Sequence, residues 1–135
     1  MRIFFDRCAA VALARMVRGF EGSKVLIRHH DEDGRFTTTT ADEVWISTLA
    51  ADGDPLWLVI SGDGRILRNK AQRAVLDGAK LPFFYLAKGW INRPIHEQAW
   101  KFMKVWPEIL ARARQGKGRI FEVTSGSSLK VDVIA

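Results

Sequence analysis

The sequence predicts an α/β fold, a three-layer sandwich with a mainly parallel central sheet. Short apolar runs that are typical of strands alternate with segments of helical periodicity over roughly residues 1 to 90. Such alternation predicts parallel strands joined by helices that cover both faces of a sheet. The run Leu56–Ile60 is apolar throughout, as expected for a strand that is buried on both faces.

The expected elements follow one another as strand, helix, strand, helix, strand, helix and strand. The first helix has one apolar face, and the second begins with a sequence typical of a capping box. In that box Thr40 is the expected N-cap, Glu43 is its partner, and Gly53 lies just beyond the helix end. The expected ranges are Arg2–Phe5, Ala9–Phe20, Val25–Ile27, TADEVWISTLAADG (40–53), Leu56–Ile60, Asn69–Gly78 and Phe83–Leu86.

The last third of the chain has a different pattern. Apolar residues recur at helical spacing from Pro94 to Gln115, although Pro107 is expected to kink or split this helix. The segments IFEVT and LKVDVIA then alternate apolar and polar residues, and SGSS between them predicts a hairpin turn. We therefore expect a single domain over residues 1–135, in which a C-terminal helix and hairpin form an extension from about residue 91.

The composition is that of a globular protein with a basic surface. Apolar residues make up 47% of the chain and charged residues 27%, which argues against wholesale disorder. The formal net charge of +6 favours an anionic partner such as nucleic acid or an acidic protein, although basic solubility alone is an alternative. The single cysteine cannot form an internal disulfide, and no apolar stretch is long enough to cross a bilayer. We therefore expect a cytoplasmic protein without membrane contact.

Carboxylates occur where the expected strands end. Asp6 follows the first strand, and Asp63 follows the third in the turn Ser61–Gly64. Because parallel strands share one direction, these side chains are expected at the same edge of the sheet. Asp42 and Glu43, at the start of a helix that follows a strand, are expected there too. Clustered carboxylates repel one another unless a cation lies among them, and hard divalent ions prefer oxygen ligands, so the pattern predicts a Mg²⁺ or Mn²⁺ site.

Each of these residues also has a purely structural explanation. Asp6 and Asp63 could be ordinary turn residues at strand ends. Asp42 could merely stabilise a helix N-terminus, and Glu43 could be only the partner in a capping box. Cys8 is interpreted as a small buried residue rather than a nucleophile, because no paired histidine is evident. It is the occurrence of all three aspartates together that favours a site.

Three segments carry a resemblance to a known family. IFFD at the N-terminus, ADEVW on a helix and WLVISGDGRI after it resemble the PIN-like domains, in particular the VapC-type toxin branch. The resemblance covers roughly residues 1 to 90 and matches Asp6, Asp42 and Asp63 to the acidic positions of that family. A separate acidic residue on an early helix has no matching motif, and the residues that could substitute for it are Glu21, Asp31 and Asp33.

The resemblance implies a Mg²⁺-dependent endoribonuclease, commonly the toxin of a type II toxin–antitoxin pair. In this interpretation Asp6, Asp42 and Asp63 are catalytic and hold metal, with Glu43 as a further ligand. The expected partners are an RNA substrate and a cognate antitoxin protein, and a homodimer is an open alternative. Basic side chains that would contact RNA phosphates are Arg65, Arg68, Lys70, Arg112 and Arg114.

Two other functions remain open. A non-catalytic PIN-like module could bind RNA or a protein through its basic surface. A receiver-like phosphoacceptor domain also clusters carboxylates at strand ends, but it expects an acidic pair where Arg7 follows Asp6, and Lys88 is only a loose match to its lysine. His29 and His30 lie in the polar loop after the second strand, where they could touch a substrate, but they are interpreted as solvated because loop histidines usually are.

Overall fold

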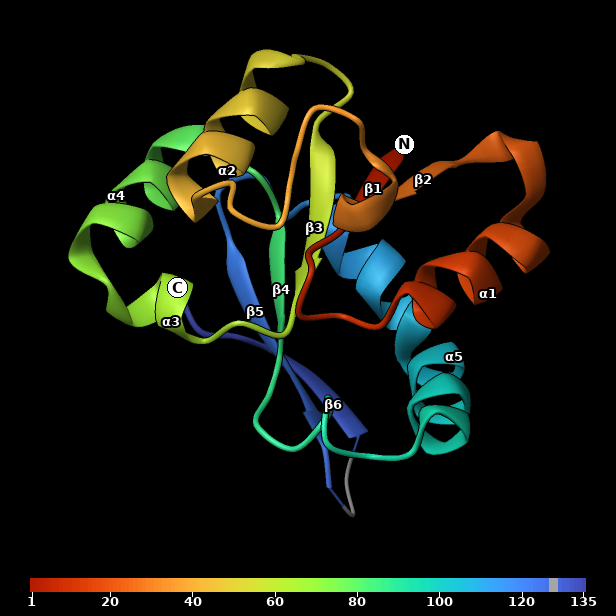
Figure 1. Cartoon of the computed structure of the whole chain (residues 1–135). Coiled ribbons are helices and arrows are strands. Elements are labelled where there is room, and N and C mark those ends of the chain that lie inside the picture. Colours follow the sequence, from red (N-terminus) through yellow and green to blue (C-terminus); the bar gives the residue numbers. More distant parts are fainter. Residues whose placement is uncertain (127–128) are drawn as a thin grey trace.

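The computed structural model describes residues 1–126 and 129–135, which form one six-stranded sheet with helices on both faces (Figure 1). The strands are β1 (Arg2–Phe5), β2 (Leu26–His29), β3 (Trp57–Ser61), β4 (Phe83–Leu86), β5 (Ile120–Ser125) and β6 (Leu129–Val133). The α-helices are α1 (Val11–Glu21), α2 (Asp42–Ala51), α3 (Arg65–Arg68), α4 (Lys70–Ala79) and α5 (Ile95–Ala113), and short 3-10 turns cover Gly22–Lys24 and His30–Glu32.

The sheet is parallel except at one edge. Its strand order is β2-β1-β3-β4-β5-β6, and only the β5–β6 pair is antiparallel. Phe5 at the end of β1 is aligned with His29 on β2 and with Ile60 on β3. The carboxyl ends of these three strands therefore lie level, and the segments that follow them start from the same edge of the sheet.

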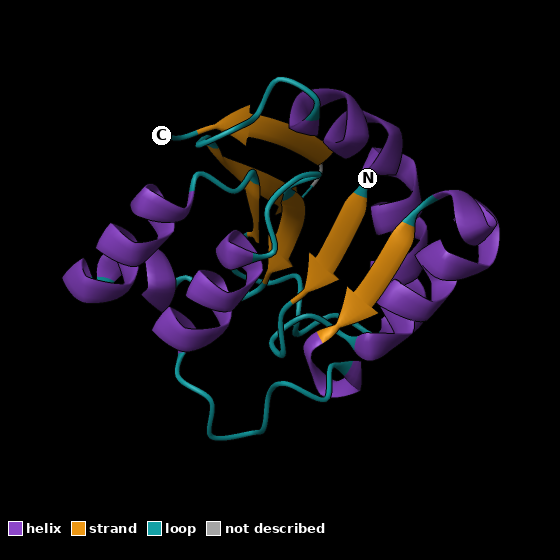
Figure 2. Ribbon diagram, turned by 90° about the horizontal axis from the view of Figure 1, so that it is seen from above, coloured by secondary structure: helices purple, strands orange, loops and turns teal. Residues whose placement is uncertain are grey.

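Two hydrophobic clusters fill the space on either side of the sheet. One cluster joins α1 and α5 to one face, through residues such as Leu13 and Phe102 packed near Phe5. The other joins α2, α3 and α4 to the opposite face, where Phe4, Trp45 and Trp57 are almost fully buried. Figure 2 shows the two helical layers with the strands between them. The predicted three-layer α/β sandwich with a mainly parallel sheet is confirmed.

The connection from β4 to β5 differs from the other crossovers. Strand β5 lies beyond β4 in the same direction in which β4 lies beyond β3. However, α5 packs beside α1, on the face opposite to α4. The β4–β5 connection therefore has the opposite hand to the three earlier ones, whereas crossovers between parallel strands are almost always of one hand.

The boundaries of the elements differ from expectation at a few informative places. Thr40 does not cap α2: the N-cap is Ala41 without a side-chain hydrogen bond, and the Thr40 hydroxyl accepts from the backbone N–H of Thr37 instead. Glu43 therefore takes part in no capping box. Helix α5 runs through Pro107 as one element, so the expected split is wrong. The short helix α3 was not expected from the sequence.

The C-terminal segment is part of the same sheet. Strand β5 pairs in parallel with β4, and β6 pairs with β5 as the antiparallel hairpin that the alternating pattern predicts. The expected turn SGSS lies partly outside the described residues, since Ser127 and Ser128 are not among them. None of the described helices is long and apolar enough to span a membrane.

A buried ion-pair network holds the loop that leads from β2 to α2. Asp33 is 5% exposed and accepts hydrogen bonds from the backbone N–H of Arg35 at 3.0 Å and from its guanidinium at 2.9 Å. Arg35 also donates to Asp52 at the end of α2, at 3.0 Å. Burial raises the pKa of Asp33, but the hydrogen bonds and charge of Arg35 outweigh burial and leave that pKa below its ordinary value.

We expect Asp33→Asn to lower the free energy of unfolding by about 1–3 kcal/mol at neutral pH, because the guanidinium of Arg35 loses its buried charged partner. The folded-state pKa is depressed, so the stabilisation is present above about pH 4 and is lost as the pH falls through the lower folded-state value. Urea unfolding at pH 7 and near pH 2 measures the difference, with the exposed Asp132→Asn as control. An equal loss of stability at both pH values would contradict this interpretation.

Candidate functional site

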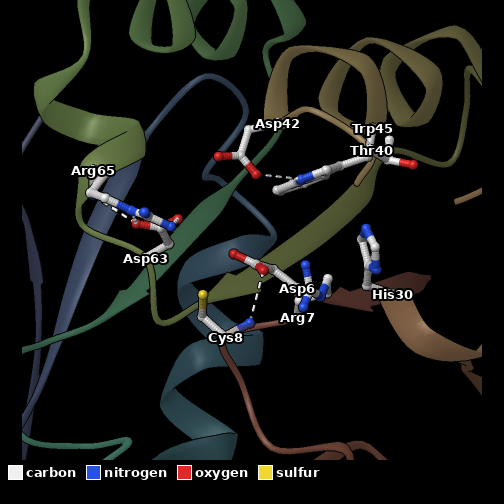
Figure 3. A pocket seen from close by; sticks show the side chains of 9 residues that line it. All are labelled: Asp6, Arg7, Cys8, His30, Thr40, Asp42, Trp45, Asp63 and Arg65. Atoms are coloured by element: carbon white, nitrogen blue, oxygen red, sulfur yellow. Dashed lines mark hydrogen bonds and ion pairs between the residues drawn. The ribbon is translucent and has the colours of Figure 1, made fainter. Parts of the chain in front are cut away.

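A cavity of about 210 Å³ lies at the carboxyl edge of the sheet, where the segments after β1 and β3 come together (Figure 3). The chain continues from β1 to β2 on one side and reaches β3 on the other, so the cavity lies at the switch point at which open α/β sheets commonly bind ligands. The residues that line it are Asp6, Arg7, Cys8, His30, Thr40, Asp42, Trp45, Asp63 and Arg65.

Asp6 is placed by the end of β1 and is almost completely buried. Its backbone N–H donates to the Ile60 carbonyl at 2.9 Å, which continues the β1–β3 ladder by one residue. Its carboxylate accepts from the Cys8 N–H at 3.0 Å and from the Ser61 hydroxyl. Burial raises the pKa of Asp6 to about 6; these two hydrogen bonds oppose the rise, and the negative charges of Asp42 and Asp63 add to it.

Asp63 is held by the turn that follows β3. Its backbone N–H donates to the Ser61 hydroxyl at 3.0 Å, so this one side chain is bonded to both aspartates. The Asp63 carboxylate accepts from the Arg65 backbone N–H and from its guanidinium, each at 2.9 Å. Burial raises the pKa of Asp63, but the hydrogen bonds from Arg65 and the charges of Arg65 and Arg68 outweigh burial and hold that pKa below its ordinary value.

The glycine before Asp63 allows the two strand-end turns to approach each other. A Cβ atom at Gly62 would lie 2.8 Å from the Cys8 carbonyl oxygen and 2.9 Å from a methyl carbon of Ile91. The first contact is with backbone, which cannot be relieved by a side-chain rotation. Any larger residue at position 62 would therefore push the turn after β3 away from the turn after β1, and with it Asp63 away from Asp6.

Asp42 reaches the cavity from the first turn of α2. Its carboxylate accepts from the indole N–H of Trp45 at 2.8 Å, and Trp45 is itself 1% exposed and stacked on Phe4 with ring centroids 5.4 Å apart. The ring anchors the start of α2 against the sheet. Three aspartates from three different elements thus line one cavity, as the strand-end argument predicts.

The donor set suits a hard divalent cation in its chemistry, since it consists of carboxylate oxygens and a hydroxyl. Within residues 1–126 and 129–135, however, no three His, Cys, Asp or Glu side chains lie close enough together to hold one metal ion. Protein donors engage all three aspartates, and the guanidinium of Arg65 is the cation on Asp63. The Arg65 side chain is 76% exposed, so this ion pair contributes little free energy and a bound cation could displace it.

The other predicted site residues lie at several places. Glu43 is adjacent to Asp42 but is not among the residues that line the cavity. Arg65 lines the cavity, Arg68 lines a neighbouring one, and Lys70 is the first residue of α4. Helix α5 starts after β4 and returns to the start of β5, so Arg112 and Arg114 lie at the opposite edge of the sheet.

The three alternative carboxylates do not line the cavity either. Glu21 accepts a hydrogen bond from the Trp106 indole at 2.8 Å, Asp33 belongs to the Arg35 network, and Asp31 lines a separate cavity beside Thr37. None of these three residues therefore takes the place, in this cavity, of the acidic residue for which the sequence has no matching motif.

Several residues that line the cavity were not predicted. His30 is 2% exposed, so its interpretation as a solvated loop residue is wrong, as it is for His29, at 1%. His30 follows β2 as Asp6 follows β1, and β2 ends level with β1, so its place at this edge could have been predicted in the same way. Burial, followed by the negative charges of Asp6 and Asp63, raises the pKa of Cys8 to about 11. The Cys8 thiol is therefore protonated at neutral pH, as expected for a cysteine that is not a nucleophile.

The family model that describes the PIN-like domain matches residues 1–88. The chain belongs to the PIN-like domain family. A search of curated proteins and a search of solved structures gave no significant match. The matched region includes Asp6, Asp42 and Asp63 and ends just after β4. PIN domains are generally nucleases, so the fold is of a nuclease type, while membership of the toxin branch stays a prediction.

We expect Asp6→Asn to stabilise the protein at alkaline pH when divalent ions are removed with EDTA. The folded-state pKa is raised to about 6, so the favourable contribution of the neutral carboxyl is complete below about pH 4 and is lost as the pH rises through about 6. Asparagine stays neutral, so the variant should be more stable than wild type by up to about 3 kcal/mol at pH 8 and about equal at pH 4. Urea unfolding at the two pH values is the measurement, and a variant that is less stable at both would show that the carboxylate stabilises the fold.

Proposed function

We propose that this chain is a metal-dependent endoribonuclease that hydrolyses single-stranded RNA. The observation that carries the proposal is the meeting of Asp6, Asp42 and Asp63, from three separate elements, at one cavity at the carboxyl edge of the sheet. A structural role for each aspartate alone would not require this convergence. The nuclease-type fold and the net charge of +6 are consistent with an anionic polymer as substrate.

To hold a divalent cation, Asp63 would have to leave Arg65 and the three carboxylates would have to move within reach of one ion. When bound, such a cation supplies stabilisation of negative charge on the phosphate and a more acidic water for in-line attack. In that attack the water would give up a proton to solvent as its oxygen bonds to phosphorus, while the bond from phosphorus to the leaving ribose oxygen would break and the leaving oxygen would take up a proton. The Ser61 hydroxyl orients both the Asp6 carboxylate and the turn that carries Asp63. Once Arg65 has left Asp63, its guanidinium would be free to contact the scissile phosphate.

The toxin role is the finer part of this proposal, and it rests on the resemblance of IFFD, ADEVW and WLVISGDGRI to VapC-type toxins. It requires a cognate antitoxin protein, for which the basic surface would favour acidic segments. A small acidic or DNA-binding protein encoded by the neighbouring reading frame would support this role. A neighbouring frame of unrelated kind would leave the nuclease proposal in place without the toxin role.

A second candidate function is a non-catalytic PIN-like module that binds RNA or a protein. One specific observation favours it, namely that protein donors already engage all three aspartates and, within the described part of the chain, no three acidic, histidine or cysteine side chains are within reach of one ion. The two functions predict different results when the Asp63 charge is removed: loss of cleavage for the nuclease, and little change for the binding module.

We expect Asp63→Asn to abolish Mg²⁺-dependent cleavage of an unstructured RNA while leaving RNA binding unchanged or slightly stronger, because a negative charge that faces phosphate has gone. A gel assay with Mg²⁺, Mn²⁺ and EDTA lanes measures cleavage, and fluorescence anisotropy measures binding. Asp132→Asn, the same change at an exposed position on β6, is the matched control and should cleave like wild type. Cleavage that persists in EDTA or in Asp63→Asn would contradict the metal-ribonuclease proposal.

The pairing of Asp63 with Arg65 gives a second test that needs no RNA. If Asp63 is a metal ligand, the guanidinium competes with the cation, so Arg65→Ala should bind Mn²⁺ several-fold more tightly than wild type. Asp63→Asn should bind Mn²⁺ at least tenfold more weakly, and the control Arg73→Ala should not change the affinity. Isothermal titration calorimetry distinguishes these cases, and equal Mn²⁺ affinity in all four proteins would favour the binding module.

A further inference from the structure

A second cavity lies beside the first at the carboxyl edge of the sheet, between the ends of β3 and β4. Its volume is about 350 Å³, at the lower end of the roughly 300–1,000 Å³ of small-ligand sites. Its polar lining side chains are Arg68, Tyr85, Lys88 and Asn92, together with the backbone of Gly62 and Gly64. The acidic cavity and this basic one therefore follow the order of the strands in the sheet.

The turn between β3 and α3 is the wall between the two cavities. Asp63 lines the acidic cavity, and the glycines on either side of it line the basic one. Arg68 is close enough to lower the pKa of Asp63 by its charge. A ligand that spans both cavities would therefore pass directly over the turn Ser61–Gly64.

Two donors converge above Gly64. A Cβ atom at this position would lie 2.9 Å from the Tyr85 hydroxyl oxygen and 3.1 Å from Nη1 of Arg68. The phenol and the guanidinium thus share the space that a side chain at position 64 would fill. Glycine leaves room for both groups beside the turn, and it is typical of places where a ligand approaches the backbone closely.

The cations of this cavity are not committed to protein carboxylates. In the part of the chain that the structure describes, neither Arg68 nor Lys88 takes part in an ion pair, whereas the nearby Arg65 is paired with Asp63. Both side chains are exposed, and both line the cavity. Unpaired cations beside a phenol hydroxyl are a donor set that suits a phosphate, which accepts several charge-assisted hydrogen bonds.

We propose that this cavity binds the backbone phosphate next to the scissile one in a single-stranded RNA that crosses the edge of the sheet. The assignment of RNA rests on the proposed function, and the phosphate site adds what that function lacks, a means of holding the substrate in register. Arg68 and Lys88 supply the charge, and Tyr85 supplies a neutral hydrogen bond. Because only the backbone is contacted, the site should act equally on all sequences.

The test is RNA binding in EDTA, where cleavage does not interfere. Fluorescence anisotropy with short unstructured oligoribonucleotides is measured over a range of salt concentrations for Arg68→Ala, Lys88→Ala and Tyr85→Phe. The matched control is Lys104→Ala, which removes an exposed cation from α5 outside both cavities. Circular dichroism confirms that each variant is folded.

We expect Arg68→Ala and Lys88→Ala each to weaken binding roughly tenfold for every RNA sequence, and to reduce the slope of log affinity against log salt by about 0.7. Tyr85→Phe should weaken binding about threefold without changing the slope, because it removes a hydrogen bond but no charge. Lys104→Ala should change affinity less than twofold.

Two results would overturn the phosphate site. One is affinity in Arg68→Ala and Lys88→Ala equal to that of Lys104→Ala. The other is unchanged RNA binding together with lost binding of polyglutamate, which would assign the cavity to an acidic protein partner. The outcome is separable from the proposed function. Weakened RNA binding in the variants, with no Mg²⁺-dependent cleavage by wild type, would support the phosphate site and contradict the nuclease proposal. Unchanged RNA binding in the variants, with Mg²⁺-dependent cleavage by wild type, would support the nuclease proposal and contradict the phosphate site.

Discussion

The close approach of the segments after β1 and β3 is the constraint on which the site depends. The parallel register brings the ends of the two strands level, and the hydrogen bond from the Asp6 N–H to the Ile60 carbonyl extends the ladder to the first aspartate. Ser61 then bonds to Asp6 and to the backbone of Asp63, while Gly62 packs against the carbonyl of Cys8. The Ser61 hydroxyl and the absence of a side chain at Gly62 therefore hold Asp6 and Asp63 near each other despite the repulsion between their carboxylates.

This arrangement costs the protein stability in the absence of a cation. Asp6 is buried to 3% exposure with two other aspartates nearby, and its raised pKa reports the unfavourable free energy of the charged form. The protein compensates with donors of its own, which are a backbone N–H, the Trp45 indole and the Arg65 guanidinium. The Arg65 side chain is largely exposed, so a bound cation could take its place on Asp63. Unfavourable burial of charge of this kind is common at functional sites, where a loss of stability accompanies activity.

Sequence patterns predicted the features that depend on strand direction and failed where tertiary contacts decide. Alternation of strands and helices gave the parallel sheet, and the strand ends placed Asp6 and Asp63 at one edge. Capping by Thr40 failed because a neighbouring backbone N–H competes for its hydroxyl. The position of Arg114 depends on α5 running the length of the sheet. The face that α5 covers is set by the apolar surface left open beside α1. Local periodicity shows neither the direction of this helix nor the face that it covers.

The segment beyond the family match adds to the hydrophobic core and to the sheet. Within residues 1–88, α1 is the only described helix on its face of the sheet, while Phe84, Leu86 and Ile60 also belong to that face. Helix α5 brings Phe102 and Trp106 into the same cluster, and β5 extends the sheet with Phe121 stacked on Phe84 at 4.5 Å between ring centroids. The segment that leads into α5 also supplies Lys88 and Asn92 to the basic cavity. Lys88 is the last residue of the family match and Asn92 lies just beyond it, so the basic cavity is formed where the matched region passes into the segment that completes the hydrophobic core.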